Sequence, residues 1–275
     1  MSHSTYGSMM QQQLNLLGAG IDEKQLLQYL SFEAASTMDC LLAEKVKVKR
    51  MRTMDAKQAS RTLYEASEHD PVFIYARDTP DARDSPFTRR IERLQFAIAA
   101  QQWARRKIGL TVNHGRAVVC ASVASASPPA PEAEKRGPID KQVDNIYRLI
   151  GRLLNLVGKS KEQRKRFDEV QMKLGKYAEE MLGEDMKKMR SVNALATAPA
   201  FQRRGYGGAL VDAITELADA EGRSTYLFSS NPINTEFYNS HGFFTLAVVS
   251  VGDDNPTWKR PPVLIPLMVR IYGDK

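Results

Sequence analysis

The stretch ATAPAFQRRGYGGALV, residues 196–211, places two arginines and three glycines where a strand-like run passes into a helix. The residues that follow it, up to Gly222, carry apolar side chains at helical spacing. The first turn of a helix has unpaired backbone N–H groups, and the helix dipole adds about half a positive charge there. Glycines remove the Cβ atoms that would hold an anion away, and arginines supply charge. The stretch therefore predicts a site that binds a phosphate or diphosphate at the start of a helix.

Three glycine-rich patterns bind phosphates in this way, and one of them fits. A P-loop requires a glycine five residues before Gly-Lys-Ser, but residues 158–160 have Leu153 at that position. A dinucleotide fingerprint fails because residues 18–20 are followed by Glu23 in place of the third glycine. The third pattern, Gln/Arg-x-x-Gly-x-Gly/Ala, is met by residues 202–207. That hexapeptide closely resembles the loop that binds the pyrophosphate of acetyl-CoA in the GNAT acyltransferase superfamily.

The surroundings of the hexapeptide strengthen the resemblance. It follows a strand ending at Thr197 and opens an amphipathic helix, and Asn231, Asn234 and Tyr238 come further along the chain. These positions are similar to the second half of the family's cofactor site. The resemblance is sharp over residues 191–270 and plausible over 45–123, and it does not cover 1–44 or 138–188.

The resemblance and the sequence pattern together predict an α/β (α+β) fold. We expect a GNAT-like mixed, mostly antiparallel sheet flanked by helices, with a helical insertion between the third and fourth strands. Residues 1–44 are expected to form an N-terminal helical extension. Residues 45–275 would form the acetyltransferase domain, interrupted by a proline-rich loop and helical insertion at about 124–188. The insertion carries two apolar stripes, expected to pack on each other and on the main body, and a solvated basic face from Lys159 to Arg166.

The resemblance also implies which residues bind the acyl donor. The backbone of a strand over 191–197 would pair with the pantetheine arm like an extra strand, where this strand splays from the next, at 225–230. Asn231 could bond the pantetheine amides or simply precede Pro232. Asn234 could bond them equally or cap a short helix. The residues expected to bind the cofactor are Leu195, Ala196, Thr197, Gln202, Arg203, Arg204, Gly205, Tyr206, Gly207, Gly208, Asn231 and Asn234.

The chemistry implied is direct attack by an amine on the thioester of acetyl-CoA in a ternary complex. Tyr238 matches the tyrosine that protonates the departing thiolate in many relatives, although a core tyrosine is the simpler alternative. No residue stands out as the base among Glu65, Glu68, His69 and Asp70. Cys40 and Cys120 are not expected to act as nucleophiles.

Composition sets the remaining expectations. The chain has 275 residues, a formal net charge of +7, two cysteines and four histidines, which form neither a disulfide framework nor a metal pattern. We therefore expect no metal, no membrane segment and a cytoplasmic location, with the nucleus also open. Acetyl-CoA as co-substrate is what the resemblance to the GNAT superfamily implies. A non-catalytic acyl-CoA-binding or regulatory domain is an alternative, as is a nucleic-acid-interacting protein using the basic insertion. The acceptor, whether a lysine, a protein N-terminus, a polyamine or a small amine, is not readable.

Overall fold

In the computed structural model, which describes residues 46–123 and 137–273, seven strands form one sheet in the order β1-β2-β3-β4-β5-β7-β6. Neighbouring strands are antiparallel except β4 and β5, which run parallel. The strands are β1 (Val48–Arg50), β2 (Gly109–Val112), β3 (Ala117–Val123), β4 (Arg190–Thr197), β5 (Thr225–Phe228), β6 (Phe244–Val251) and β7 (Val263–Arg270). This mixed, mostly antiparallel sheet confirms the predicted fold class.

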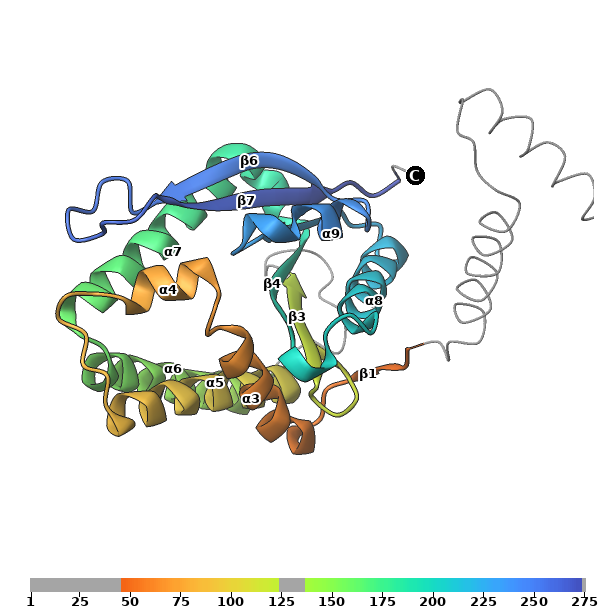
Figure 1. The fold of residues 1–275 in the computed structure, drawn as a ribbon. Helices are drawn as coiled ribbons and strands as arrows, with labels where there is room; N and C mark the ends of the chain where they lie inside the picture. The colour runs from red at the N-terminus through yellow and green to blue at the C-terminus, as the bar shows by residue number, and fades with distance from the viewer. Residues whose placement is uncertain (1–45, 124–136, 274–275) are drawn as a thin grey trace, which may run out of the picture. The chain divides into compact units, whose positions relative to one another are not determined.

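Helices cover both faces of the sheet (Figure 1). They are α3 (Ala56–Ala66), α4 (Pro71–Arg77), α5 (Pro86–Arg106), α6 (Pro138–Gly158), α7 (Lys161–Leu182), α8 (Tyr206–Ala220) and α9 (Thr235–Asn239). Short 3-10 turns occupy η1 (Thr53–Asp55), η3 (Gly183–Lys187), η4 (Pro199–Phe201) and η5 (Pro232–Asn234). The pair α6 and α7 lies between β3 and β4 in the chain, which confirms the predicted helical insertion.

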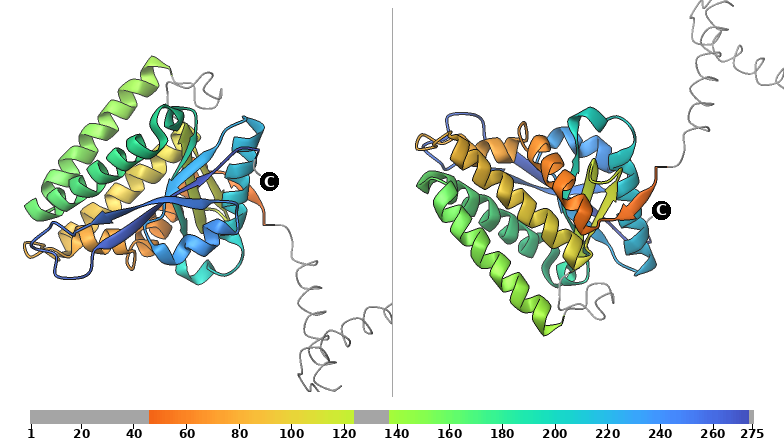
Figure 2. Two further views of the ribbon diagram at one scale, coloured as in Figure 1. Left: turned by 90° about the horizontal axis from the view of Figure 1, so that it is seen from above. Right: turned by 90° about the horizontal axis from the view of Figure 1, so that it is seen from below.

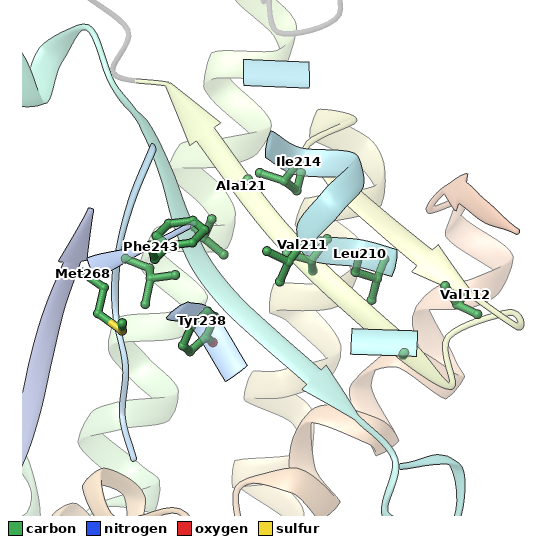
Figure 3. Packing of buried hydrophobic residues seen from close by; sticks show 12 residues of the cluster. Val112, Ala121, Leu210, Val211, Ile214, Tyr238, Phe243 and Met268 are labelled. Atoms are coloured by element: carbon green, nitrogen blue, oxygen red, sulfur yellow. The ribbon is translucent and has the colours of Figure 1, made fainter. Parts of the chain in front are cut away.

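Alternation along the strands divides the core between the two faces. Ala117, Val119 and Ala121 of β3 point to the face covered by α8 and α9, and Figure 3 shows side chains of this cluster gathered between the helices and the sheet. Val118 points to the other face, against α3 and α5. A third cluster joins β6 and β7 to α4 and α7. Strand β3 therefore contributes side chains to the core layer on each face of the sheet.

Helix α7 belongs to the core of the domain. Its Val170 packs with Tyr75 of α4 and with Val249 of β6. Its Arg166, which the sequence placed on a solvated basic face, is completely buried, and its guanidinium donates to the carbonyl oxygens of Tyr75 and Asp78, each at 2.8 Å. The expected basic face is therefore wrong at Arg166, because the guanidinium closes the C-terminal end of α4.

Helix α6 packs on its neighbour through a polar face and leaves most of its large apolar side chains exposed, which is the reverse of a usual surface helix. Figure 2 shows α6 at the outer edge of the helices on its side of the sheet. Its polar and small positions, such as Asp144 and Asn155, meet Arg105 and Gln95 of α5. Its apolar stripe points outward, since the exposed large side chains of α6 are Ile139, Ile146, Leu149, Ile150, Leu153, Leu156 and Val157. The expectation that this stripe packs on the main body is wrong, because salt bridges and hydrogen bonds fix the other face of α6 on α5.

Several predictions lie outside the described ranges: the extension at 1–44, Cys40 and the proline-rich loop at 124–136. Within 46–123 and 137–273, none of the helices has the length and apolar character required to cross a bilayer.

Candidate active site

The site begins where β4 and β5 separate. The two strands pair over three residues, Arg190–Val192 with Thr225–Leu227, and no further. The pairing of β4 with β3 shifts at the step Cys120–Ala121, which leaves Asn193 without an opposite residue. A bulge of this kind bends a strand and ends its regular pairing. The edge of β4 from Asn193 to Thr197 therefore presents unpaired backbone groups to the space beside β5.

That space is a cavity of about 970 Å³, within the range of about 300–1,000 Å³ typical of ligand sites. Its walls come from the open edge of β4, the start of α8, the segment after β5 and the end of α3. The structure brings nearly all the predicted site residues to this cavity: Leu195, Ala196, Thr197, Gln202, Arg203, Gly205, Tyr206, Gly207, Gly208, Asn231, Asn234 and Tyr238. Arg204 does not line it, because its guanidinium lies over the ring of Phe201, 4.9 Å from the centroid.

The glycine-rich turn forms the start of α8, where the first backbone N–H groups of the helix have no partner within the helix. Gly205 precedes the helix in the left-handed region at φ 72°, which favours glycine. A Cβ on Gly207 would meet only side-chain atoms, the nearest being Phe237 Cζ at 3.5 Å, so glycine here keeps one side of the amide row bare. Gly208 has a packing role, because a Cβ there would come within 3.2 Å of the His241 ring.

Tyr238 lies on α9, and Figure 3 shows its side chain within the main core cluster. The same side chain is among those that line the cavity. Burial raises the pKa of its hydroxyl to about 12, and the nearby Asp70 carboxylate adds to the increase. The phenol therefore keeps its proton at neutral pH. Tyr238 is therefore a core residue that also faces the cavity, and its role as an acid stays a prediction.

Asp70 is the residue that sequence reasoning left undecided and that the structure brings beside Tyr238. Its Oδ1 accepts from the backbone N–H groups of Val72 and Phe73, at 3.0 and 3.2 Å, which caps α4. Its Oδ2 accepts from the Ser230 hydroxyl. Burial raises the pKa of the Asp70 carboxyl, although these hydrogen bonds oppose the increase. The Asp-Pro step at 70–71 is a helix-start signal that could have marked this position.

The other candidates for the base lie in different surroundings. His69 lines the same cavity as Asp70, whereas Glu68 lines a different one. Glu65 is paired with Arg61, with 2.6 Å between Nε and Oε1. Cys120 is buried in β3 and does not line the cavity.

The two asparagines differ in how their side chains are used. The Asn231 side chain accepts from the backbone N–H of Ile233 at 3.2 Å, which caps the short turn that follows. Asn234 occupies the N-cap position of α9 without a capping side-chain bond, so its amide is free of the role that competed with ligand binding. Trp258 lies outside the cavity, where its indole N–H donates to the Pro261 carbonyl at 2.9 Å and its ring packs on Tyr75.

The sheet splits between β4 and β5 beside the glycine-rich start of α8. A family model described as an acetyltransferase (GNAT) domain matches residues 173–244, which span the splayed strands, the glycine-rich turn and Tyr238. This part of the chain is therefore similar to an acetyltransferase (GNAT) domain.

A solved structure shows the same fold at low identity. Arylalkylamine N-acetyltransferase 2 from Aedes aegypti is 13% identical with a TM-score of 0.51, covering 83% of this chain and 99% of its own. A mosquito arylalkylamine N-acetyltransferase like 5b is 14% identical with a TM-score of 0.46, covering 82% and 99%. A comparison with curated proteins gave no match.

Proposed function

We propose that this protein transfers the acetyl group of acetyl-CoA to an amine by direct attack in a ternary complex. The observation that carries the proposal is the cavity between β4 and β5, which holds the glycine-rich turn at one end and Tyr238 with Asp70 further in. Within 46–123 and 137–273, no cluster of His, Cys, Asp and Glu side chains is suited to a metal ion. The proposed mechanism uses side chains and backbone of the chain itself.

The start of α8 is suited to the diphosphate of the donor. Backbone N–H groups of residues 206–208 point from the first turn of the helix, and the helix dipole adds partial positive charge. Arg203, which lines the cavity, supplies a full charge. The free edge of β4 supplies N–H and C=O groups to the amides of the pantetheine arm, as an added strand would.

Bound acetyl-CoA supplies a thioester as the acetyl source. The amine nitrogen forms the new C–N bond and the C–S bond breaks, so the nitrogen must lose a proton and the thiolate must gain one. We assign the first proton to the Asp70 carboxylate and the second to the Tyr238 hydroxyl. The departing thiolate lies in the same poorly solvated site, which raises its basicity as it raises the pKa of the phenol.

Calorimetry with acetyl-CoA and a thiol-release assay with a panel of amines test the proposal. Tyr238→Phe should bind acetyl-CoA with wild-type affinity and lose about 100-fold or more in turnover, because the variant lacks only the proton. A protein that binds acetyl-CoA and releases no thiol with any amine would instead be a non-catalytic acyl-CoA-binding domain. Absence of acetyl-CoA binding would rule out both functions.

A further inference from the structure

A second cavity of about 610 Å³ adjoins the first one on the side of the helical insertion. We call it the insertion chamber. Its walls come from α4 and α5 on one side and from α6 and α7 on the other, with Gly151, Asn155 and Phe167 contributed by the insertion. Phe73 and Phe96 line both cavities, so these two rings form a shared wall between the insertion chamber and the proposed active site.

The shared wall lies close to the proposed chemistry. The backbone N–H of Phe73 donates to Asp70, so one turn of α4 carries both the wall and the proposed proton acceptor. The Phe73 and Phe96 ring centroids are 5.9 Å apart, and Tyr64 packs on Phe96 at 6.2 Å. Phe73 of the shared wall is therefore fixed beside Asp70, which itself lines the first cavity and not the insertion chamber.

The walls of the insertion chamber combine aromatic and aliphatic side chains with charged ones, among them Glu68 and Arg83. The Arg77 guanidinium pairs with Glu92 at 2.5 Å, and Arg89 pairs with Asp84 at 2.7 Å. The Lys159 ammonium lies over the Phe167 ring, 4.2 Å from its centroid. These ionic groups are occupied by one another or by a ring, and aromatic and aliphatic side chains such as Ile91 form much of the remaining surface.

We propose that the insertion chamber holds the body of the acceptor, a primary amine on an aromatic or branched aliphatic group. This inference rests on the proposed function and assigns its substrate class. The volume suits such a molecule, and rings that pack offset or edge-to-face favour an aromatic one. The amino group extends past Phe73 and Phe96 toward Asp70, and the helical insertion thereby sets the acceptor preference.

Two glycines offer a matched test. Gly151 of α6 and Gly175 of α7 both lie inside helices, and a Cβ on either would meet no atom within 4 Å. Of these two glycines, Gly151 lines the insertion chamber and Gly175 does not. Leucine at 151 therefore fills the chamber without a backbone clash, and leucine at 175 makes the same change elsewhere.

We expect Gly151→Leu to raise the KM for 2-phenylethylamine by about tenfold or more, with Gly151→Ala giving a smaller increase. The KM for ethylamine and the acetyl-CoA affinity should stay at wild-type values, and Gly175→Leu should change neither amine. Calorimetric titration of 2-phenylethylamine into each variant gives the same comparison without turnover.

The outcomes separate the two proposals. The proposal for the insertion chamber would be overturned if the ratio of the KM for 2-phenylethylamine to the KM for ethylamine were the same in wild type and Gly151→Leu. It would also be overturned if Gly175→Leu changed this ratio as much as Gly151→Leu does. If acetyl-CoA binds but no amine is acetylated, the proposed function fails. In that case, binding of 2-phenylethylamine that weakens in Gly151→Leu and not in Gly175→Leu would still support a chamber that binds apolar amines. If wild type did not bind 2-phenylethylamine, this second proposal would fail as well.

Discussion

Gly207 is the residue at which the donor site is most simply tested. A Cβ there meets only ordinary contacts, the nearest at 3.5 Å, so a larger side chain is compatible with the fold but covers the amide row of α8. We expect Gly207→Val to weaken acetyl-CoA binding by about tenfold or more, measured by calorimetry, at nearly unchanged thermal stability. Gly205 is less suitable, because valine at φ 72° would strain the backbone itself. Wild-type affinity in a folded Gly207→Val variant would contradict the proposed diphosphate site.

Asp70 links the proposed mechanism to the pH dependence of stability. Its carboxyl has a raised pKa in the folded state, so between the unfolded and the folded pKa the native protein holds a proton that the unfolded chain has released. The free energy of unfolding therefore falls as pH rises through that window. An asparagine side chain at this position cannot ionise and can still cap α4.

The variant Asp70→Asn should accordingly gain stability relative to wild type as pH rises from about 3 to about 7, measured by urea unfolding at each pH. Turnover should fall by about 100-fold or more at neutral pH, because the proposed proton acceptor is lost. A stability difference that does not change with pH would show that Asp70 titrates normally. Retained turnover would assign the proton transfer to another group.

Sequence reasoning reached the residues of this site unevenly. The glycine-rich hexapeptide is readable because its function depends on backbone and on the absence of side chains, which residue type reports directly. Asp70 was not separated from Glu65 and Glu68, because the Asp-Pro step marks a helix start and does not say which of the three acids faces the cavity. Asn193 carried a usable signal, because asparagine is unfavourable inside a strand and here it lies at the bulge that opens the cleft.

At the scale of elements, α6 shows the limit of hydrophobic periodicity. The spacing of its apolar residues predicts a helix, and α6 is one, but the pattern does not say which face is buried. Leu153 is 52% exposed, whereas Leu210 of α8 is fully buried. We therefore expect Leu153→Gln to change the free energy of unfolding by at most about 0.5 kcal/mol, and Leu210→Ala to lower it by about 2–5 kcal/mol.

Chemical denaturation of the two variants in parallel measures this contrast. Because both wild-type residues are leucines at helix positions, differences in helix propensity contribute only tenths of a kcal/mol. A loss at Leu153 comparable to that at Leu210 would mean that the apolar stripe of α6 is covered in solution.

The longer helices were predictable because their apolar residues recur with a clear period, and most strands because of their β-rich composition. Helix α4 was not predicted. Its seven residues, PVFIYAR, read as a short apolar run that fits a strand equally well. What makes them helical lies at the ends of α4 and elsewhere in the chain. The Asp70 side chain caps the first turn, and the Arg166 guanidinium donates to carbonyl oxygens at the last one. A helix that depends on contacts with distant parts of the chain cannot be predicted from the pattern of its own residues.

At the scale of the whole molecule, the insertion is part of the domain that it interrupts. Arg166 of α7 reaches across to the C-terminal end of α4, and its Nη2 donates to Thr257 in the loop between β6 and β7 at 2.9 Å. Its guanidinium also lies near the Tyr75 ring, 5.0 Å from the centroid. One buried side chain thus joins the insertion, the helix that Asp70 caps and the last hairpin of the sheet.

We expect Arg166→Met to lower the free energy of unfolding by about 3 kcal/mol, because methionine fills part of the volume but leaves the buried carbonyl oxygen of Tyr75 and the partly buried one of Asp78 without this donor. Lys165→Met, at the adjacent exposed position, is the matched control and should change it by at most about 0.5 kcal/mol. Urea unfolding of both variants measures the difference. The loss should also reach the site, since α4 carries Phe73 and follows Asp70, so the KM for a bulky amine should rise more than the Kd for acetyl-CoA. An Arg166→Met variant as stable as the control would mean that α7 is attached to the domain by its apolar contacts alone.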